Sequence, residues 1–397
     1  MNDTHISNAD TNRGYRFSAF ILSAILILNT QSRADAGDWV SFRGNPQLTG
    51  VAAGFFPDNP HLLWTFEAGE GIESTAAIAA GTVYVGALDG NLYAINLESG
   101  SLKWKYSASD EIKSSPAVFR KTVYFGDEMG VFHAVDAETG QQRWIFQTDG
   151  GIISSANFAG DSVLFGSYDQ YLYSVSAETG ALIWKFETEG YVHGTPTVVD
   201  VRSSGSLPYP NDVVVTTGCD GYLRVINVLN GEENNKIPLG DYVAASPAVL
   251  KTRAFVGTFG NQVLGVDLNH AEILWNYEPA KGGFPFYASA AVTNDAVIVG
   301  GRDKRIHALK PQTGEPLWIY PTKARVDSSP VIIGNRVLFG TVGGVIYALN
   351  INTGEPVWQF VTGSSIVASP CVAGGNLVIG SDDGVLYCFG GGTRSNE

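Results

Sequence analysis

The side chains best suited to chemistry occupy one recurring position, two residues before a Ser or Thr that returns along the chain. Its occupants are Glu73, Lys113, Ile153, His193, Ala244, Tyr287, Asp327 and Val367. An imidazole with a carboxylate is a common pair for proton transfer, so His193 with Asp327 or Glu73 is the first set to weigh. The alternative is a recognition surface, because this position changes chemically from copy to copy while the residue before it is always apolar.

Two landmarks give the period of the elements that carry this position. The Ser or Thr recurs at Thr75, Ser115, Ser155, Thr195, Ser246, Ser289, Ser329 and Ser369. A tryptophan recurs with the same period, and Asn235 takes its place in one copy. Both landmarks count eight copies, about 40 residues apart, and a unit of this length made of strands and turns is typical of a β-propeller blade.

Each copy contains four short apolar or alternating segments, which predict four strands. In the first copy these are Thr75 to Ala79, Thr82 to Ala87, Asn91 to Asn96 and Leu102 to Tyr106. The last copy ends at Phe389 after its third segment, and His61 to Glu67 stands alone before the first copy. Pairing these ends removes two exposed sheet edges. We therefore predict an all-β, eight-bladed β-propeller of four-stranded antiparallel blades over residues 61–390, closed by an N-terminal strand that completes the last blade.

In a propeller, the loops that enter the innermost strands and the hairpins between second and third strands open on one face, around the central channel. The candidate binding residues on this face are Glu73, Lys113, His193, Phe286, Tyr287, Asp327, Tyr168, Phe259 and Arg302. Mixed charges and aromatic rings favour a protein or peptide partner over a tight cofactor cage. Two alternatives stay open: these positions are only solvated, or the loop around Tyr287 folds its own aromatic rings inward.

The same geometry disfavours an acid–base set. His193 and Asp327 belong to copies three blades apart, so they form a hydrogen bond only if their side chains meet across the channel. Glu73 and Lys113 belong to neighbouring blades, and we expect an exposed ion pair of little energetic weight there. We therefore predict no catalytic residues.

The N-terminus has the layout of a cleaved export signal over residues 1–36. Arg13 and Arg16 precede an apolar run from Phe17 to Leu28 that is too short to span a bilayer, and Ala34-Asp35-Ala36 supplies small residues for cleavage. No cysteine stands near this site, so we expect no lipid anchor. The sequence predicts a periplasmic or secreted protein without a transmembrane span in the mature chain, an irregular arm over 37–60 and a tail over 391–397.

Composition narrows the partners. The chain has 25 Lys and Arg against 39 Asp and Glu, a formal net charge of −14, which disfavours nucleic acid because its binding requires neutralising phosphates. The six His residues are scattered without a metal-binding spacing, so we expect no metal. One propeller with its sheet edges closed is expected to be a monomer.

The repeats carry a family likeness. Glu178-Thr179-Gly180 followed by Trp184, the same arrangement before Trp144, and Thr353-Gly354 before Trp358 resemble the pyrroloquinoline-quinone (PQQ) type of propeller repeat. The resemblance covers residues 61 to 389. It implies that the tryptophans dock between neighbouring blades: Trp64, Trp104, Trp144, Trp184, Trp275, Trp318 and Trp358.

The resemblance implies two possible functions. Quinone-dependent dehydrogenases hold PQQ with calcium, often below a disulfide between adjacent cysteines, and this chain has no such Cys-Cys pair. The exported BamB-like branch is non-catalytic and binds protein partners. We predict a non-catalytic scaffold for a protein or peptide partner, in envelope or outer-membrane protein assembly, with no cofactor. The alternative is a PQQ-binding oxidoreductase.

Overall fold

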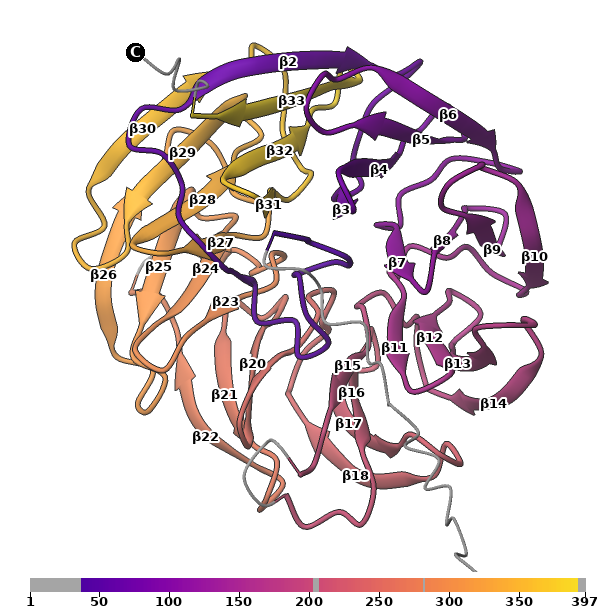
Figure 1. Cartoon of the computed structure of the whole chain (residues 1–397). Coiled ribbons are helices and arrows are strands. Elements are labelled where there is room, and N and C mark those ends of the chain that lie inside the picture. Colours follow the sequence, from indigo (N-terminus) through magenta and orange to yellow (C-terminus); the bar gives the residue numbers. More distant parts are fainter. Residues whose placement is uncertain (1–36, 203–206, 281–282, 392–397) are drawn as a thin grey trace, which may run out of the picture. The chain divides into compact units, whose positions relative to one another are not determined.

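A computed structural model describes residues 37–202, 207–280 and 283–391. Eight sheets stand in a ring, which confirms the predicted all-β, eight-bladed propeller (Figure 1). The predicted signal peptide and residues 392–397 of the predicted tail lie outside the described residues. In the described ranges, no helix has the length and hydropathy that crossing a membrane requires.

Each blade has four antiparallel strands, numbered outward from the channel. The innermost strands are β3 Ala77–Ala79, β7 Ala117–Phe119, β11 Asn157–Ala159, β15 Thr197–Val199, β19 Ala248–Leu250, β23 Ala291–Val292, β27 Val331–Ile333 and β31 Cys371–Ala373. The second strands are β4 Thr82–Gly86, β8 Thr122–Gly126, β12 Ser162–Gly166, β16 Val213–Thr217, β20 Arg253–Gly257, β24 Val297–Gly301, β28 Arg336–Gly340 and β32 Asn376–Gly380.

The third strands are β5 Asn91–Asn96, β9 Val131–Asp136, β13 Tyr171–Ser176, β17 Tyr222–Asn227, β21 Val263–Asp267, β25 Arg305–Leu309, β29 Val345–Asn350 and β33 Val385–Gly390. The outermost strands are β6 Leu102–Ser107, β10 Gln142–Gln147, β14 Leu182–Glu187, β18 Glu233–Pro238, β22 Glu272–Tyr277, β26 Pro316–Pro321, β30 Pro356–Val361 and β2 His61–Glu67. We number the blades 1 to 8 from the one that begins with β3.

Packing between blades explains the strand sequences. All five residues of β4 are buried, because neighbouring blades cover both faces of the sheet. The outermost strand β6 instead alternates exposed and half-buried residues, as a strand with one solvated face does. The ring is closed as predicted: β2 pairs with β33 in an antiparallel register from His61↔Gly390 to Glu67↔Val385.

The recurring tryptophans lie between blades. Trp64 Nε1 donates a hydrogen bond to the Leu97 carbonyl of the next blade at 2.8 Å. The indole ring packs on a turn glycine, where a Cβ added to Gly100 would lie 2.7 Å from ring atoms of Trp64. Comparable indole hydrogen bonds to the next blade are made by Trp104, Trp144, Trp184, Trp275 and Trp318.

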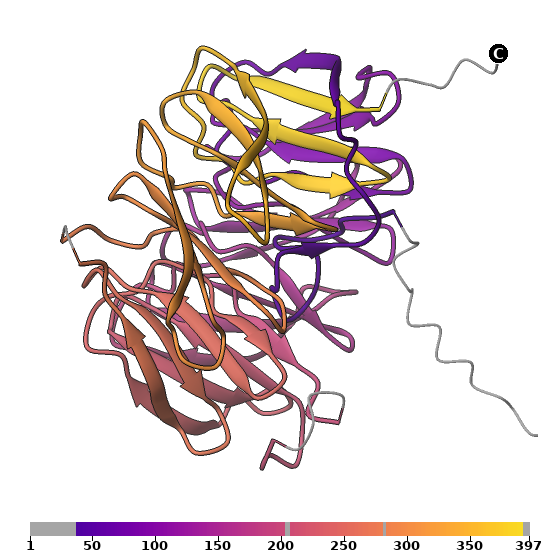
Figure 2. The same ribbon diagram turned by 90° about the vertical axis from the view of Figure 1, so that its left-hand side faces the viewer.

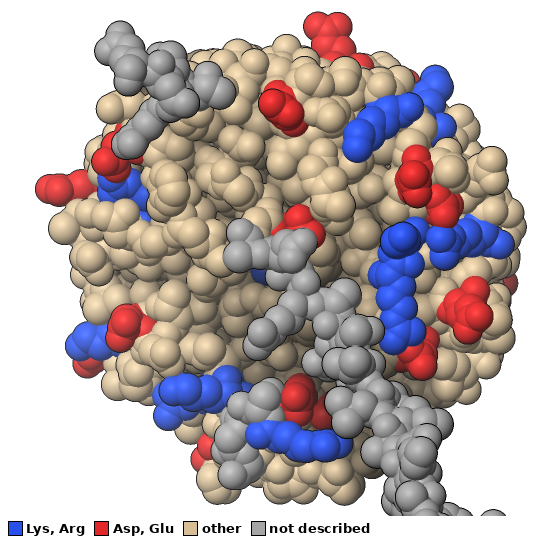
Figure 3. Space-filling view, viewed as in Figure 1, with Lys and Arg blue, Asp and Glu red and all other residues tan. Residues whose placement is uncertain are grey.

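The arm, residues 37–60, lines one end of the channel. Its backbone carbonyls between Trp39 and Gly50 accept hydrogen bonds from the inner strands of blades 1, 2, 4, 5, 6 and 7. Its short strand β1 Val51–Ala52 pairs in parallel with β27. Figures 1 and 2 show the arm crossing the face of the ring opposite to the loop that contains residues 283–287. Charged side chains on the arm face lie mainly toward the rim (Figure 3).

Candidate binding site at the mouth of the channel

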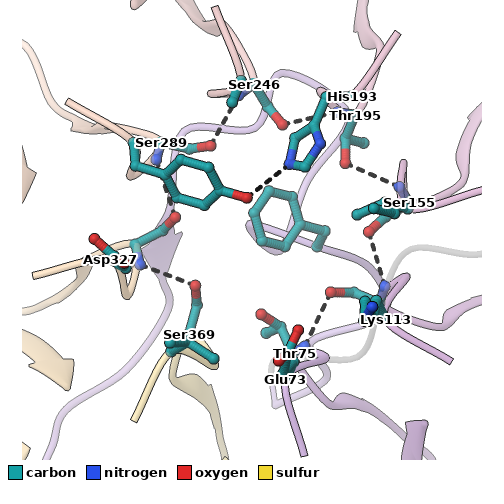
Figure 4. Close-up of a pocket in the computed structure, with 17 residues that line it drawn as sticks. Glu73, Thr75, Lys113, Ser155, His193, Thr195, Ser246, Ser289, Asp327 and Ser369 are labelled. Atoms are coloured by element: carbon teal, nitrogen blue, oxygen red, sulfur yellow. Dashed lines mark hydrogen bonds between the residues drawn. The ribbon is translucent and has the colours of Figure 1, made fainter. Parts of the chain in front are cut away.

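The other end of the channel is an open cavity, here called the mouth. All eight residues of the variable position line it: Glu73, Lys113, Ile153, His193, Ala244, Tyr287, Asp327 and Val367. A second layer consists of the eight recurring Ser and Thr residues, here called the hydroxyl ring (Figure 4). Phe42 of the arm is the remaining lining residue of this lower part, a cavity of about 120 Å³.

The residues of the hydroxyl ring were predicted only as a landmark of the repeat, although they line the channel. Presence in every copy was the signal that could have identified it. Phe42 carried no comparable signal, because the arm has no period.

His193 joins two tyrosines from different blades. Tyr168 Oη lies 2.6 Å from His193 Nδ1, and Tyr287 Oη lies 3.0 Å from His193 Nε2. Tyr168 comes from the hairpin of blade 3 and Tyr287 from the loop that enters blade 6, so the three side chains span this sector of the mouth. Burial lowers the pKa of His193 to about 4, so the imidazole is neutral at pH 7 and bridges the two hydroxyls.

The ion pair expected between Glu73 and Lys113 is absent from the described residues. Lys113 Nζ instead lies 3.1 Å from a carboxylate oxygen of Glu111 and 3.1 Å from one of Glu128. Glu111 is in the same loop, and Glu128 is in the hairpin of the same blade. Burial raises the pKa of Glu73, an effect that the nearby Lys113 charge opposes.

Asp327 is held by two arginines. Arg302 Nε and Nη2 donate to its two oxygens at 2.9 and 3.1 Å, and Arg325 Nε lies 3.1 Å from Oδ2. The Arg302 guanidinium also lies 4.6 Å from the ring centre of Tyr287, a cation–π distance. Asp327 therefore positions Arg302, and no described hydrogen bond joins it to His193.

Phe286 was wrongly predicted as a binding residue. Its side chain is 1% exposed and belongs to the hydrophobic cluster that contains Phe255 of blade 5 and Val299 of blade 6. The reason is its register: it occupies the apolar position before the variable one, as Ile72 and Ile112 do in blades 1 and 2.

Exposed aromatic rings surround the Tyr168, His193 and Tyr287 group. Four side chains form what we call the aromatic arc: Tyr191, Tyr242, Phe259 and Phe284. Tyr191 stacks on Tyr168 with ring centres 4.7 Å apart, and Phe259 meets Tyr287 edge-on at 6.2 Å. The arc follows loops and hairpins of blades 3 to 6. The predicted candidates Tyr168, Phe259 and Arg302 thus lie with Glu73, Lys113, His193, Tyr287 and Asp327 at the mouth.

The described lining residues do not fit a calcium-held quinone. Calcium takes six to eight oxygen ligands, several of them carboxylates. In the described ranges, the group of side chains close enough to hold a metal is Asp267, His270 and Glu272, on the outer turn of blade 5. None of these residues lines the channel.

Sequence comparison assigns the chain to a protein family. The family model described as "Outer membrane protein assembly factor BamB" matches residues 49–167 and 169–394. The chain belongs to this family. The BamB model thus covers the ring, the closing strand β2 and the end of the arm.

Solved structures share the BamB-family fold at low sequence identity. BamB from Moraxella catarrhalis superimposes with a TM-score of 0.70 at 20% identity, over 85% of this chain and 100% of that one. Quinohemoprotein alcohol dehydrogenase from Comamonas testosteroni superimposes with a TM-score of 0.76 at 15% identity, over 92% and 82%. Both likenesses show the fold alone.

A curated relative matches part of the chain. The serine/threonine-protein kinase AfsK of Streptomyces griseus is 28% identical over 144 residues, which are 34% of this chain. The match spans 18% of the kinase.

Proposed function

We propose that this BamB-family chain is an exported, non-catalytic scaffold that binds a protein or peptide partner at the mouth of its channel. The family description suggests a role in outer membrane protein assembly. Export rests on the signal predicted for residues 1–36 and places the protein in the periplasm or the outside medium.

The aromatic arc carries this proposal. Five large aromatic side chains are exposed in the described part of the chain, by 36–73%, and four of them form the arc beside the mouth. Exposed apolar surface costs free energy in water, and clustered Tyr and Phe with Arg at their edge are typical of protein interfaces. Arg302 supplies a charge beside Tyr287, the ring that Phe259 of the arc contacts.

Affinity capture from an envelope extract of the source organism tests the proposal. The bait variant carries Tyr242→Ser and Phe284→Ser, two exposed rings whose loss leaves the propeller core intact. The matched control is Leu229→Ser, because Leu229 is 65% exposed and lies on the turn between β17 and β18, on the opposite face. The proposal expects a partner that the wild type and Leu229→Ser retain and the double variant loses. Equal capture by all three baits would contradict it.

The alternative function is that of a PQQ-dependent oxidoreductase, which the fold shared with a quinohemoprotein alcohol dehydrogenase brings to mind. Purified protein is titrated with PQQ and calcium while bound-cofactor absorbance and dye reduction by alcohols are followed. Saturable binding with turnover would support the enzyme and overturn the scaffold proposal.

A further inference from the structure

Seven hydrogen bonds form a belt that links the members of the hydroxyl ring from blade 1 to blade 8. Ser115, Ser155, Thr195, Ser246, Ser289, Ser329 and Ser369 each accept a hydrogen bond from the backbone N–H of the ring member on the preceding blade, at 2.8–3.2 Å. This accounts for one lone pair of each of these seven hydroxyl oxygens. The belt fixes the positions of the oxygens around the channel axis (Figure 4).

The hydroxyl protons of the ring have no protein acceptor among the described residues. A hydroxyl has one proton to donate as well as two lone pairs. The neighbouring residues Ser74 and Ser114 donate theirs to the carbonyls of Gly86 and Gly126. The ring members are 3–6% exposed and line the cavity, so their donors are left for whatever occupies it.

A buried positive charge lies next to the ring on the arm side. Arg43 is 1% exposed, and its Nη2 donates to the carbonyls of Ala290 at 2.9 Å and Pro330 at 2.6 Å. These two residues directly follow the ring members Ser289 and Ser329. Arg43 Nε and Nη1 are buried without a hydrogen-bond partner in the described ranges. Arg43 itself directly follows Phe42, which lines the cavity.

No described carboxylate forms an ion pair with Arg43. Burial lowers its pKa to about 9, so the guanidinium stays charged at pH 7. A buried charge without a counter-charge is costly, and an anion nearby reduces that cost. Of the lining carboxylates, Asp327 is already neutralised by Arg302 and Arg325.

We infer that the hydroxyl ring is a site for one small oxyanion on the channel axis. The hydroxyl protons donate to its oxygens, and Arg43 behind the ring supplies the opposite charge. A cation is excluded by the same charge, and the cavity of about 120 Å³ suits a phosphate, a sulfate or a terminal carboxylate. Two ligands offer such an oxyanion: a free inorganic anion, or the carboxyl end of a peptide that enters from the mouth. The inference does not depend on the proposed function.

Isothermal titration calorimetry of the full-length mature protein tests this site. The probes are inorganic phosphate and a short peptide with either a free or an amidated C-terminus. We expect one saturable site. Saturation by phosphate identifies a free anion, and binding of the free-acid peptide alone identifies a chain terminus. The variant Ser289→Ala/Ser329→Ala should bind the preferred probe about tenfold more weakly, since two donors are lost.

Ser328→Ala is the matched control, because Ser328 also makes a buried hydrogen bond, to Gly340 N–H, but does not line the cavity. It should bind as the wild type does, and circular dichroism of each variant verifies folding. Arg43→Gln provides a second, independent loss of affinity. Absence of saturable binding for both phosphate and the free-acid peptide would overturn the inference, as would equal affinity in the wild type and a folded Ser289→Ala/Ser329→Ala variant.

Discussion

Tyr209 and Asn235 together take the place of the tryptophan that blade 4 lacks. Asn235 Nδ2 donates to Tyr209 Oη at 2.7 Å, and Tyr209 Oη donates to the Leu268 carbonyl at 2.9 Å. Leu268 stands 33 residues after Asn235, the same separation as between Trp64 and Leu97. The long connection between β15 and β16 thus supplies the ring that the outermost strand lost. Ala271 then replaces the usual turn glycine, at φ 55°.

Removing the Tyr209 hydroxyl should therefore destabilise the protein. In Tyr209→Phe, the Asn235 amide and the Leu268 carbonyl lose a shared buried partner, at an expected cost of about 1–3 kcal/mol. Urea unfolding measures the difference. Tyr242→Phe serves as the control, since the Tyr242 side chain is 61% exposed, and its stability should equal that of the wild type. A Tyr209→Phe protein as stable as this control would show that the hydroxyl does not join the two blades.

The docking of tryptophans on turn glycines predicts a large difference between two substitutions in blade 3. Gly180 has φ 71°, and a Cβ there would lie 2.6 Å from Trp144. Gly160 has φ 59°, and a Cβ there would meet nothing within 4 Å. Gly160→Ala should cost about 1 kcal/mol through backbone strain alone.

Gly180→Ala should cost about 3 kcal/mol, because the indole must also move. Denaturant unfolding of the two variants, beside the wild type, separates the steric cost from the backbone cost. Equal losses would contradict the docking role of Trp144.

The half-buried, desolvated His193 predicts a loss of stability in acid. Its pKa is lowered to about 4 in the folded protein, whereas the pKa of a histidine in the unfolded chain is about 6.5. The unfolded state therefore takes up a proton first, and stability is lost as pH falls from about 6.5 to about 4. The contribution is at most about 3 kcal/mol, from about 1.36 kcal/mol for each pKa unit.

His193→Gln keeps a polar side chain but cannot titrate, so its unfolding free energy should fall less steeply over this pH range. Parallel pH dependences for the two proteins would show that His193 is not desolvated in the mouth.

The sequence allowed the eight-bladed propeller to be predicted, but not all of the side-chain positions at the mouth of its channel. A period shared by eight copies predicts the strand order, the blade count and the closure by His61–Glu67. It also predicts where the variable position lies. Side-chain direction within a loop does not follow from a period. Phe286 was predicted at the binding face, but its side chain is buried. Lys113 was predicted to pair with Glu73, but it pairs with Glu111 and Glu128.

Contacts between distant parts of the chain were equally hidden from sequence reasoning. His193 and Tyr287 are 94 residues apart and meet because the ring brings loops of separate blades to one axis. The arm has no repeat of its own, so its path along the inner strands and the position of Arg43 depend on backbone groups that the sequence does not distinguish.

Site-specific photo-crosslinking in living cells tests the binding role of the mouth most directly. A photoreactive phenylalanine analogue replaces Tyr242 in the aromatic arc or, in a second strain, Leu229 on the opposite face. The account predicts a discrete crosslinked product to one partner protein from position 242 and none from position 229. Products that are the same from both positions, or a product from position 229 alone, would contradict the account.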